Sequence, residues 1–176
     1  VWAPSDGTPP PDPATAFTYY HTHAKVSIER REDKQGLEVF LPKLVPETPA
    51  VMFLDPAVTV SCEALDFAFS VWRSAPQSMV GYFPRLHSES QGKTRYHSWP
   101  HVWWNGAYSM VLPAAALVPA SAVKALSRAP ALLEHASARP ECADLAFVLA
   151  VQSSTAAPPV WVPQRVALAG RPRGAA

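Results

Sequence analysis

Residues 51–87, VMFLDPAVTVSCEALDFAFSVWRSAPQSMVGYFPRLH, decide the fold of this chain. The continuous apolar run at 50–54 predicts a strand that is buried on both faces. A helix follows, with Ser61 as a suitable N-cap and Pro76 as the residue that ends it. A second apolar run at 79–83 predicts another strand. Strands that alternate with helices indicate an α/β fold.

Two features of this stretch predict packing and function. Leu65, Phe69 and Trp72 recur at helical spacing with Ala68 beside them, which predicts one apolar stripe facing a core. Asp55 closes the first strand, and open α/β sheets place ligand chemistry outside the carboxyl ends of their strands. Asp55 is therefore a candidate site residue. The alternative is an aspartate that only caps a turn.

Further elements are expected on both sides of this stretch. The patterns predict strands at 26–28, 108–112 and 159–162, and helices at 121–126 and 140–151. In the last helix Leu145, Val148 and Leu149 are expected to face inward. Residues 87–106 are polar and aromatic without periodicity, which predicts a long loop. We expect one domain over 1–165 and a flexible basic tail over 166–176.

Composition limits the classes of protein that need consideration. The chain has 176 residues, 48% of them hydrophobic and 16% charged, which suits a domain with a real core. Its net charge of +1 predicts no nucleic-acid partner and no general electrostatic attraction to an anionic membrane. No apolar run approaches the roughly 18–20 residues of a membrane span. Val1 is not an initiator methionine, so we expect a piece of a longer product.

The two cysteines leave the redox compartment open. Cys62 and Cys142 are either partners in one disulfide or two small buried apolar residues.

Five blocks of the chain, in an order and at spacings that fit one pattern, resemble a known family: VMFLDPAV, ALDFAFSVWR, MVGYFPRLH, AYSMVL and ECADLAFVLA. Together they resemble the exostosin-like glycosyltransferase domain of glycosyltransferase family 64, over about residues 1–165. The resemblance implies a GT-A-type fold, which is a Rossmann-like mixed sheet flanked by helices in a single domain. It also implies retaining transfer of an N-acetylhexosamine from a UDP-sugar to a glycan acceptor. The expected location is the lumen of the endoplasmic reticulum or Golgi, with any membrane anchor outside this chain.

The resemblance assigns roles to five residues. Asp55 matches an acid that binds Mn²⁺ or another divalent cation, and Asp144 matches the catalytic acid near the reacting sugar. Arg85 and Tyr108 lie in the matching blocks, Val1-Trp2 resembles the family's VVVWN strand, and Arg85, Trp2 and Tyr108 are assigned to substrate binding. Each role has a structural alternative. Asp144 also suits the first turn of a helix, where a negative charge is favourable, and Arg85 also suits a surface salt bridge.

The chain departs from the family at positions that carry chemistry. The acidic triplet reads Asp55-Pro56-Ala57, so one carboxylate of three remains and weak metal binding is expected. Ala143 stands where the family has an acid before the position of Asp144. The family also continues into a segment with a basic residue and a Cys that pairs with the position of Cys142. Two interpretations stay open: an active glycosyltransferase, or a non-catalytic member that binds a glycan or a protein, such as an active homologue.

Aromatic and histidine residues give weaker signals. The side chains of Tyr96, Trp99, Trp103 and Trp104 suit either a platform for a sugar ring or a loop folded over the core, and the second is slightly favoured. Pro100 stands between His97 and His101, which disfavours a helical metal site there. The pair His21/His23 lacks a third ligand nearby, so a zinc site is not expected.

Overall fold

The computed structural model describes residues 40–41, 46–126, 129, 131, 134, 136 and 138–168. All of them belong to one compact unit, Gly36–Ala176. The predicted strand at 26–28, the candidate residue Trp2 and the pair His21/His23 lie outside the described residues.

A four-stranded mixed sheet lies at the centre of this unit. Its strands, in spatial order, are β1 (Ala50–Leu54), β7 (Ala115–Pro119), β3 (Val80–Gly81) and β8 (Val160–Trp161). Strand β7 runs antiparallel to both neighbours, and β3 runs parallel to β8. Strands β1, β3 and β8 therefore share one direction, and their carboxyl ends meet at the same edge of the sheet.

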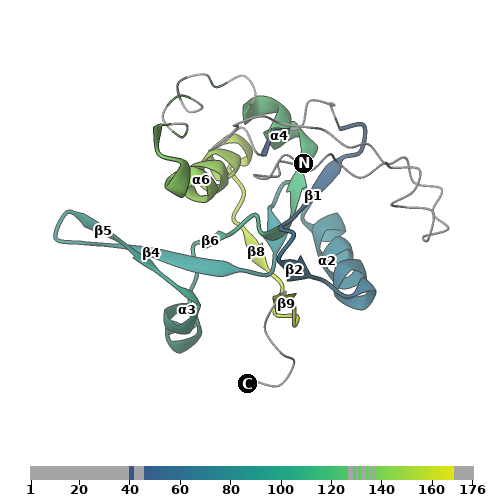
Figure 1. Cartoon of the computed structure of the whole chain (residues 1–176), viewed down its shortest axis with the longest axis horizontal. Helices are drawn as coiled ribbons and strands as arrows, with labels where there is room; N and C mark the ends of the chain where they lie inside the picture. The colour runs from purple at the N-terminus through teal and green to yellow at the C-terminus, as the bar shows by residue number, and fades with distance from the viewer. Residues whose placement is uncertain are drawn as a thin grey trace, which may run out of the picture. The chain divides into compact units, whose positions relative to one another are not determined.

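Helices cover both faces of this sheet (Figure 1). Helix α2 (Cys62–Ser74) packs on one face, and helices α4 (Ala120–Leu126) and α6 (Ala143–Thr155) pack on the other. The arrangement confirms the expected mixed α/β sheet flanked by helices.

The central strand β7 explains how two cores fit around one sheet. Ala115 and Leu117 point into the α2 side, whereas Ala116 and Val118 point into the α4–α6 side, and all four are buried. The sequence patterns did not predict this strand, because alanine is depleted in strands and Pro119 ends it. The strand predicted at 108–112 is reduced to β6 (Met110–Val111).

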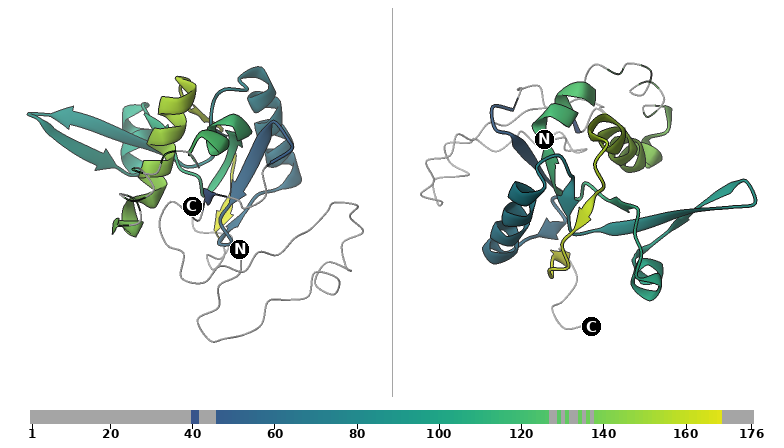
Figure 2. Two further views of the ribbon diagram at one scale, coloured as in Figure 1. Left: turned by 90° about the horizontal axis from the view of Figure 1, so that it is seen from above. Right: turned by 180° about the vertical axis from the view of Figure 1, so that it is seen from behind.

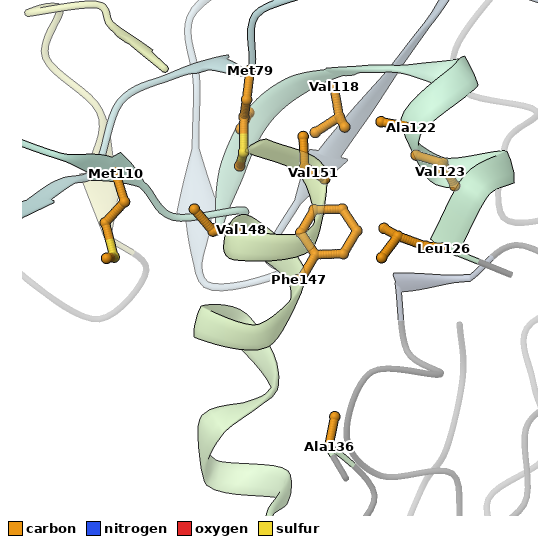
Figure 3. Close-up of a cluster of buried hydrophobic side chains, with 11 residues drawn as sticks. Met79, Met110, Val118, Ala122, Val123, Leu126, Ala136, Phe147, Val148 and Val151 are labelled. Atoms are coloured by element: carbon orange, nitrogen blue, oxygen red, sulfur yellow. The ribbon is translucent and has the colours of Figure 1, made fainter. Parts of the chain in front are cut away.

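The core on the α4–α6 side is built around Phe147 (Figure 3). Its ring centroid lies 4.6 Å from that of Phe40 and 5.1 Å from that of Phe53. Figure 3 shows the ring projecting from α6 toward Leu126 of α4. Residues far apart in the sequence thus meet at one aromatic centre.

Two expectations about helix faces were right for some residues, among them Ala68 and Trp72, and wrong for others. In α2 the buried residues are Ala64, Ala68 and Trp72, whereas Leu65 and Phe69 are 39% and 46% exposed. Ala64 and Ala68 are small and let the helix lie close to the sheet on the side of Trp72. Leu65 and Phe69 therefore face outward. In α6 Leu149 is likewise exposed, although Val148 is buried as expected.

The long loop predicted at 87–106 was also wrong. Strand β4 (Pro84–Ser90) and strand β5 (Lys93–His97) form a hairpin, and helix α3 (Trp99–Asn105) follows. The hairpin extends away from the four-stranded sheet (Figure 2). Because both of its faces are largely polar, the apolar alternation that marks a half-buried strand is missing.

The hairpin and β6 form a second sheet of three strands, in the order β5-β4-β6. A third pair joins β2 (Val58–Thr59) to β9 (Ala167–Leu168), so the expected tail at 166–176 begins with paired residues. None of the helices among the described residues has the length and apolar character needed to cross a membrane.

Candidate functional site

Asp55 lies directly after β1, at the edge where the parallel strands end. Its backbone N–H donates to the carbonyl of Ala114 at 2.7 Å, and its carbonyl accepts from the N–H of Val58 at 2.9 Å. Its side-chain Oδ1 accepts from the N–H of Ala57 at 2.7 Å. Asp55 therefore caps a turn, as the structural alternative predicted, while its carboxylate remains exposed to solvent.

Asp144 reaches the same edge from helix α6. The helix leads into β8, whose first residue lies at the opposite edge of the sheet, so the start of α6 lies near the carboxyl ends of the strands. Asp144 is in the first turn of this helix. Chain connectivity thus places the second acid at the same edge of the sheet as the first.

The two carboxylates interact. The pKa of Asp144 is raised from its ordinary value, first by burial of the carboxyl group and then by the negative charge of Asp55. The residue as a whole is exposed, so the burial concerns its carboxyl end and not its whole side chain. The helix macrodipole normally stabilises a carboxylate in the first turn. At Asp144 burial and the charge of Asp55 nevertheless raise the pKa.

The donor set at this edge limits the kind of metal site. No group of three His, Cys, Asp or Glu residues that could hold a metal ion occurs among the described residues. Asp55 and Asp144 supply two carboxylates, and Pro56 and Ala57 add no side-chain oxygen. A hard cation bound through one or two carboxylates takes its other oxygens from water and substrate phosphates. The residues therefore fit a cation that is shared with a diphosphate.

Arg85 lies in β4, half-buried, just beyond the carboxyl end of β3. Its Nη1 donates to the carbonyl of Pro84 at 2.9 Å. The guanidinium forms no ion pair within the described part of the chain, so the expected surface salt bridge is not seen there. Most of its donors remain available for an anionic ligand.

Tyr108 uses its hydroxyl for structure. The hydroxyl accepts from the backbone N–H of Trp161 at 3.2 Å and donates weakly to the carbonyl of Pro159 at 3.4 Å. The ring also packs edge-on against Trp161, with centroids 6.0 Å apart. Tyr108 thus fixes the strand β8 and, through it, the position of the Trp161 indole.

Trp161 is a candidate that the sequence patterns missed. It ends β8 at the same sheet edge, is half-buried, and also packs edge-on against Trp99 at 5.3 Å. The signal that could have found it is an aromatic residue at the carboxyl end of the last predicted strand.

The remaining candidates differ from what the sequence predicted. Cys62 and Cys142 are free thiols, one exposed and one half-buried, so they neither form a disulfide nor lie in a core. The side chains of Tyr96, Trp99, Trp103 and Trp104 are all exposed, which contradicts the expectation of a loop folded over the core.

The profile of the Glycosyl transferase family 64 domain matches residues 1–174. The chain belongs to this family. The expected resemblance is thereby confirmed over nearly the whole chain.

Curated relatives of this family-64 domain support the assignment. Over 127 residues it is 36% identical to "Glycosylinositol phosphorylceramide mannosyl transferase 1" from Arabidopsis thaliana, covering 68% of this chain and 38% of the relative. Over 147 residues it is 34% identical to Exostosin-1 from Pongo abelii, covering 82% of this chain and 19% of the relative. Exostosin-1 from Drosophila melanogaster is 32% identical over 156 residues, covering 87% and 19%. The matched segment is thus well under half the length of these relatives.

Proposed function

We propose that this domain transfers a sugar from a nucleotide-sugar donor to a glycan acceptor. The observation that carries the proposal is the placement of two acids, Asp55 after β1 and Asp144 in the first turn of α6, at the carboxyl edge of the sheet. This is where open α/β sheets bind ligands, and the match to family 64 supplies the reaction class. A GT-A-type arrangement of the sheet is part of the same proposal.

The chemistry follows from the charges at this edge. In the transfer, the bond from the anomeric carbon to the diphosphate breaks, the acceptor oxygen bonds to that carbon, and the acceptor proton is released. Asp55 helps to hold Mn²⁺ or a similar cation, which when bound neutralises the leaving diphosphate. The carboxylate of Asp144 stabilises the positive charge that develops on the sugar ring. Arg85 binds phosphate or an acidic acceptor through its planar guanidinium.

We also propose which nucleotide-sugar is the donor. A UDP-N-acetylhexosamine is the first candidate, from the family resemblance. A mannose donor is the second, because the Arabidopsis relative is named for mannosyl transfer. By the same resemblance we place the reaction in the lumen of the endoplasmic reticulum or Golgi.

A specific observation supports a second candidate function, a non-catalytic member that binds a glycan or a homologous protein. Asp55 is followed by Pro56 and Ala57, and the described residues offer no third ligand for a metal. Such a protein would keep the fold and lose turnover.

A transfer assay separates the two candidates. The purified chain is incubated with UDP-N-acetylglucosamine, UDP-N-acetylgalactosamine or GDP-mannose, Mn²⁺ and a glycan panel, and products are detected by mass spectrometry. The proposal predicts product with the wild type and a loss of at least about a hundredfold in Asp144→Asn. The control Asp66→Asn, an exposed acid on α2, should retain activity. Glycan binding without any product would instead establish the non-catalytic candidate.

A further inference from the structure

One face of the β4–β5 hairpin carries only basic and neutral side chains. Side chains alternate along β5, so Lys93, Arg95 and His97 share a face. Their partners on β4 are Ser90, Ser88 and Leu86, and the Oγ of Ser88 lies 2.7 Å from Nε2 of His97. The acid Glu89 pairs with Thr94 and therefore lies on the opposite face. Arg85 and Glu89 thus share the opposite face, and the face of Lys93 and Arg95 carries no acid.

Helix α3 adds to the basic face. The rings of His97 and His101 stack with centroids 4.0 Å apart, so α3 lies against this side of the hairpin. The pKa of His97 is lowered by partial burial and by the positive charges of His101 and Arg95, which places these groups close together.

The two most exposed large apolar side chains of the described residues stand on the same helix. Trp103 is 69% exposed and Trp104 is 83% exposed, whereas Val102 is buried and holds the helix in place. At 100° per residue, both indoles lie on the side of α3 away from Val102, and Trp104 is one turn from His101. Around the helix axis Trp104 is about 60° from His101, whereas Trp103 is about 160° from it. The basic indole surface is defined here as Lys93, Arg95, His97, His101 and Trp104, with Trp103 at its border.

We propose that the basic indole surface docks on a lipid bilayer that carries anionic headgroups. Indole rings are amphipathic and gather at membrane interfaces, and surface-bound segments combine them with Lys and Arg. Sugar sites are usually concave, with polar groups converging on the ring. Here the indoles are exposed on a short helix, α3, which lies beside the protruding β4–β5 hairpin (Figure 1). The chemistry favours a flat, anionic interface over a single glycan, and it holds whether or not the domain is an active transferase.

Vesicle flotation tests this proposal with the whole chain. The wild type is mixed with vesicles of phosphatidylcholine alone, or with about 30% phosphatidylserine, which gives a surface potential typical of anionic membranes. We expect binding to the anionic vesicles and a blue shift of tryptophan fluorescence. Lys93→Gln/Arg95→Gln should weaken binding about thirtyfold, at about 1 kcal/mol per basic residue. Trp103→Ala/Trp104→Ala should weaken it at least about tenfold through lost apolar contact.

Controls keep the outcome decisive. Phe67→Ala removes an exposed aromatic from α2 and should bind like the wild type. Each variant must unfold cooperatively at the wild-type midpoint, and the single change Trp104→Gln carries the same prediction if the double variant does not. The proposal is overturned if the wild type ignores anionic vesicles, or if Phe67→Ala loses as much binding as the tryptophan variant. Binding of soluble anionic polysaccharide without vesicle binding would assign the surface to a glycan and also overturn it.

Discussion

Asp55 and Asp144 come from a strand end and a helix start that are distant in the sequence, yet the pKa of Asp144 is raised by burial and, to a smaller extent, by the charge of Asp55. Two carboxylates held near each other disfavour the charged state of at least one of them, and this cost persists in native proteins chiefly at sites that use it. The pair is therefore the feature that most directly connects this fold to a transfer reaction.

The first prediction concerns stability and pH. Because the pKa of Asp144 is raised above its ordinary 3.8, the folded protein holds that proton more tightly than the unfolded chain does. This contribution to stability is present below 3.8 and is lost as the pH rises through the folded-state pKa. Asp144→Asn should therefore exceed the wild type in stability at neutral pH, and the two should converge as the pH falls toward 3.8.

Urea unfolding at a series of pH values measures this difference. Asp55→Asn should lower the pKa of Asp144 and reproduce part of the gain, and Asp66→Asn should show neither effect. A stability difference between Asp144→Asn and the wild type that is the same at every pH would exclude the coupling.

The second prediction concerns Gly81, where β3 pairs closely with β7. A Cβ at this position would lie 2.6 Å from the carbonyl oxygen of Ala115 and 2.7 Å from Cβ of Ala116. Both atoms belong to a packed central strand and cannot move easily. Gly81→Ala should lower the free energy of unfolding by about 3 kcal/mol or prevent folding.

Chemical denaturation provides the measurement for Gly81→Ala. The matched change Gly92→Ala, in the hairpin turn with open space around it and a φ of 69°, should cost only about 1 kcal/mol of backbone strain. Equal losses at the two glycines would contradict the described register between β3 and β7.

The third prediction tests which face of α2 is buried. Ala68 is buried against the sheet, so Ala68→Leu should overpack the interface and cost about 1–3 kcal/mol. Leu65 is 39% exposed, so Leu65→Ala should cost less than about 1 kcal/mol. Thermal unfolding of both variants compares them directly. If Leu65→Ala lowered the free energy of unfolding more than Ala68→Leu, Leu65 would belong to the buried face, as the sequence pattern predicted.

The fourth prediction concerns Tyr108, whose hydroxyl hydrogen-bonds the backbone of Pro159, just before β8, and of Trp161, at its end. Tyr108→Phe removes an acceptor for the N–H of Trp161 and should lower the free energy of unfolding by about 1 kcal/mol. Tyr96→Phe is the control, because its exposed hydroxyl forms no hydrogen bond among the described residues. If both variants unfold like the wild type, the hydroxyl of Tyr108 does not fix β8.

The parts of the fold that could be predicted from the sequence have strong local signals. Strand β1 is a continuous apolar run, and α2 begins at Ser61, whose Oγ accepts from the N–H of Ala64 at 3.2 Å. Helix α6 was recognised by its spacing, which also placed Asp144 in a first turn. These elements predict the α/β class and the positions of Asp55 and Asp144 from the sequence.

The rest depended on tertiary context. Strand β7, AALVP, has at most two residues with high strand propensity and becomes a strand because it is enclosed between two helix layers. The β4–β5 hairpin is exposed and has no core-facing alternation, so its turn at Gln91 and Gly92 was the only local signal. That Asp55 and Asp144 are neighbours follows from chain connectivity, which the sequence pattern does not contain.

The most direct test of the central claim is isothermal titration of the chain with UDP in the presence of Mn²⁺. If Asp55 and Asp144 form a site for a nucleotide diphosphate and a shared cation, the wild type should release heat that disappears without Mn²⁺. Asp55→Asn should weaken binding at least about tenfold, because a charged ligand oxygen is lost, while Asp66→Asn should bind like the wild type. If neither UDP nor GDP released heat with the wild type, the proposed nucleotide site would be excluded. Unchanged binding in Asp55→Asn would exclude Asp55 as a ligand of the shared cation.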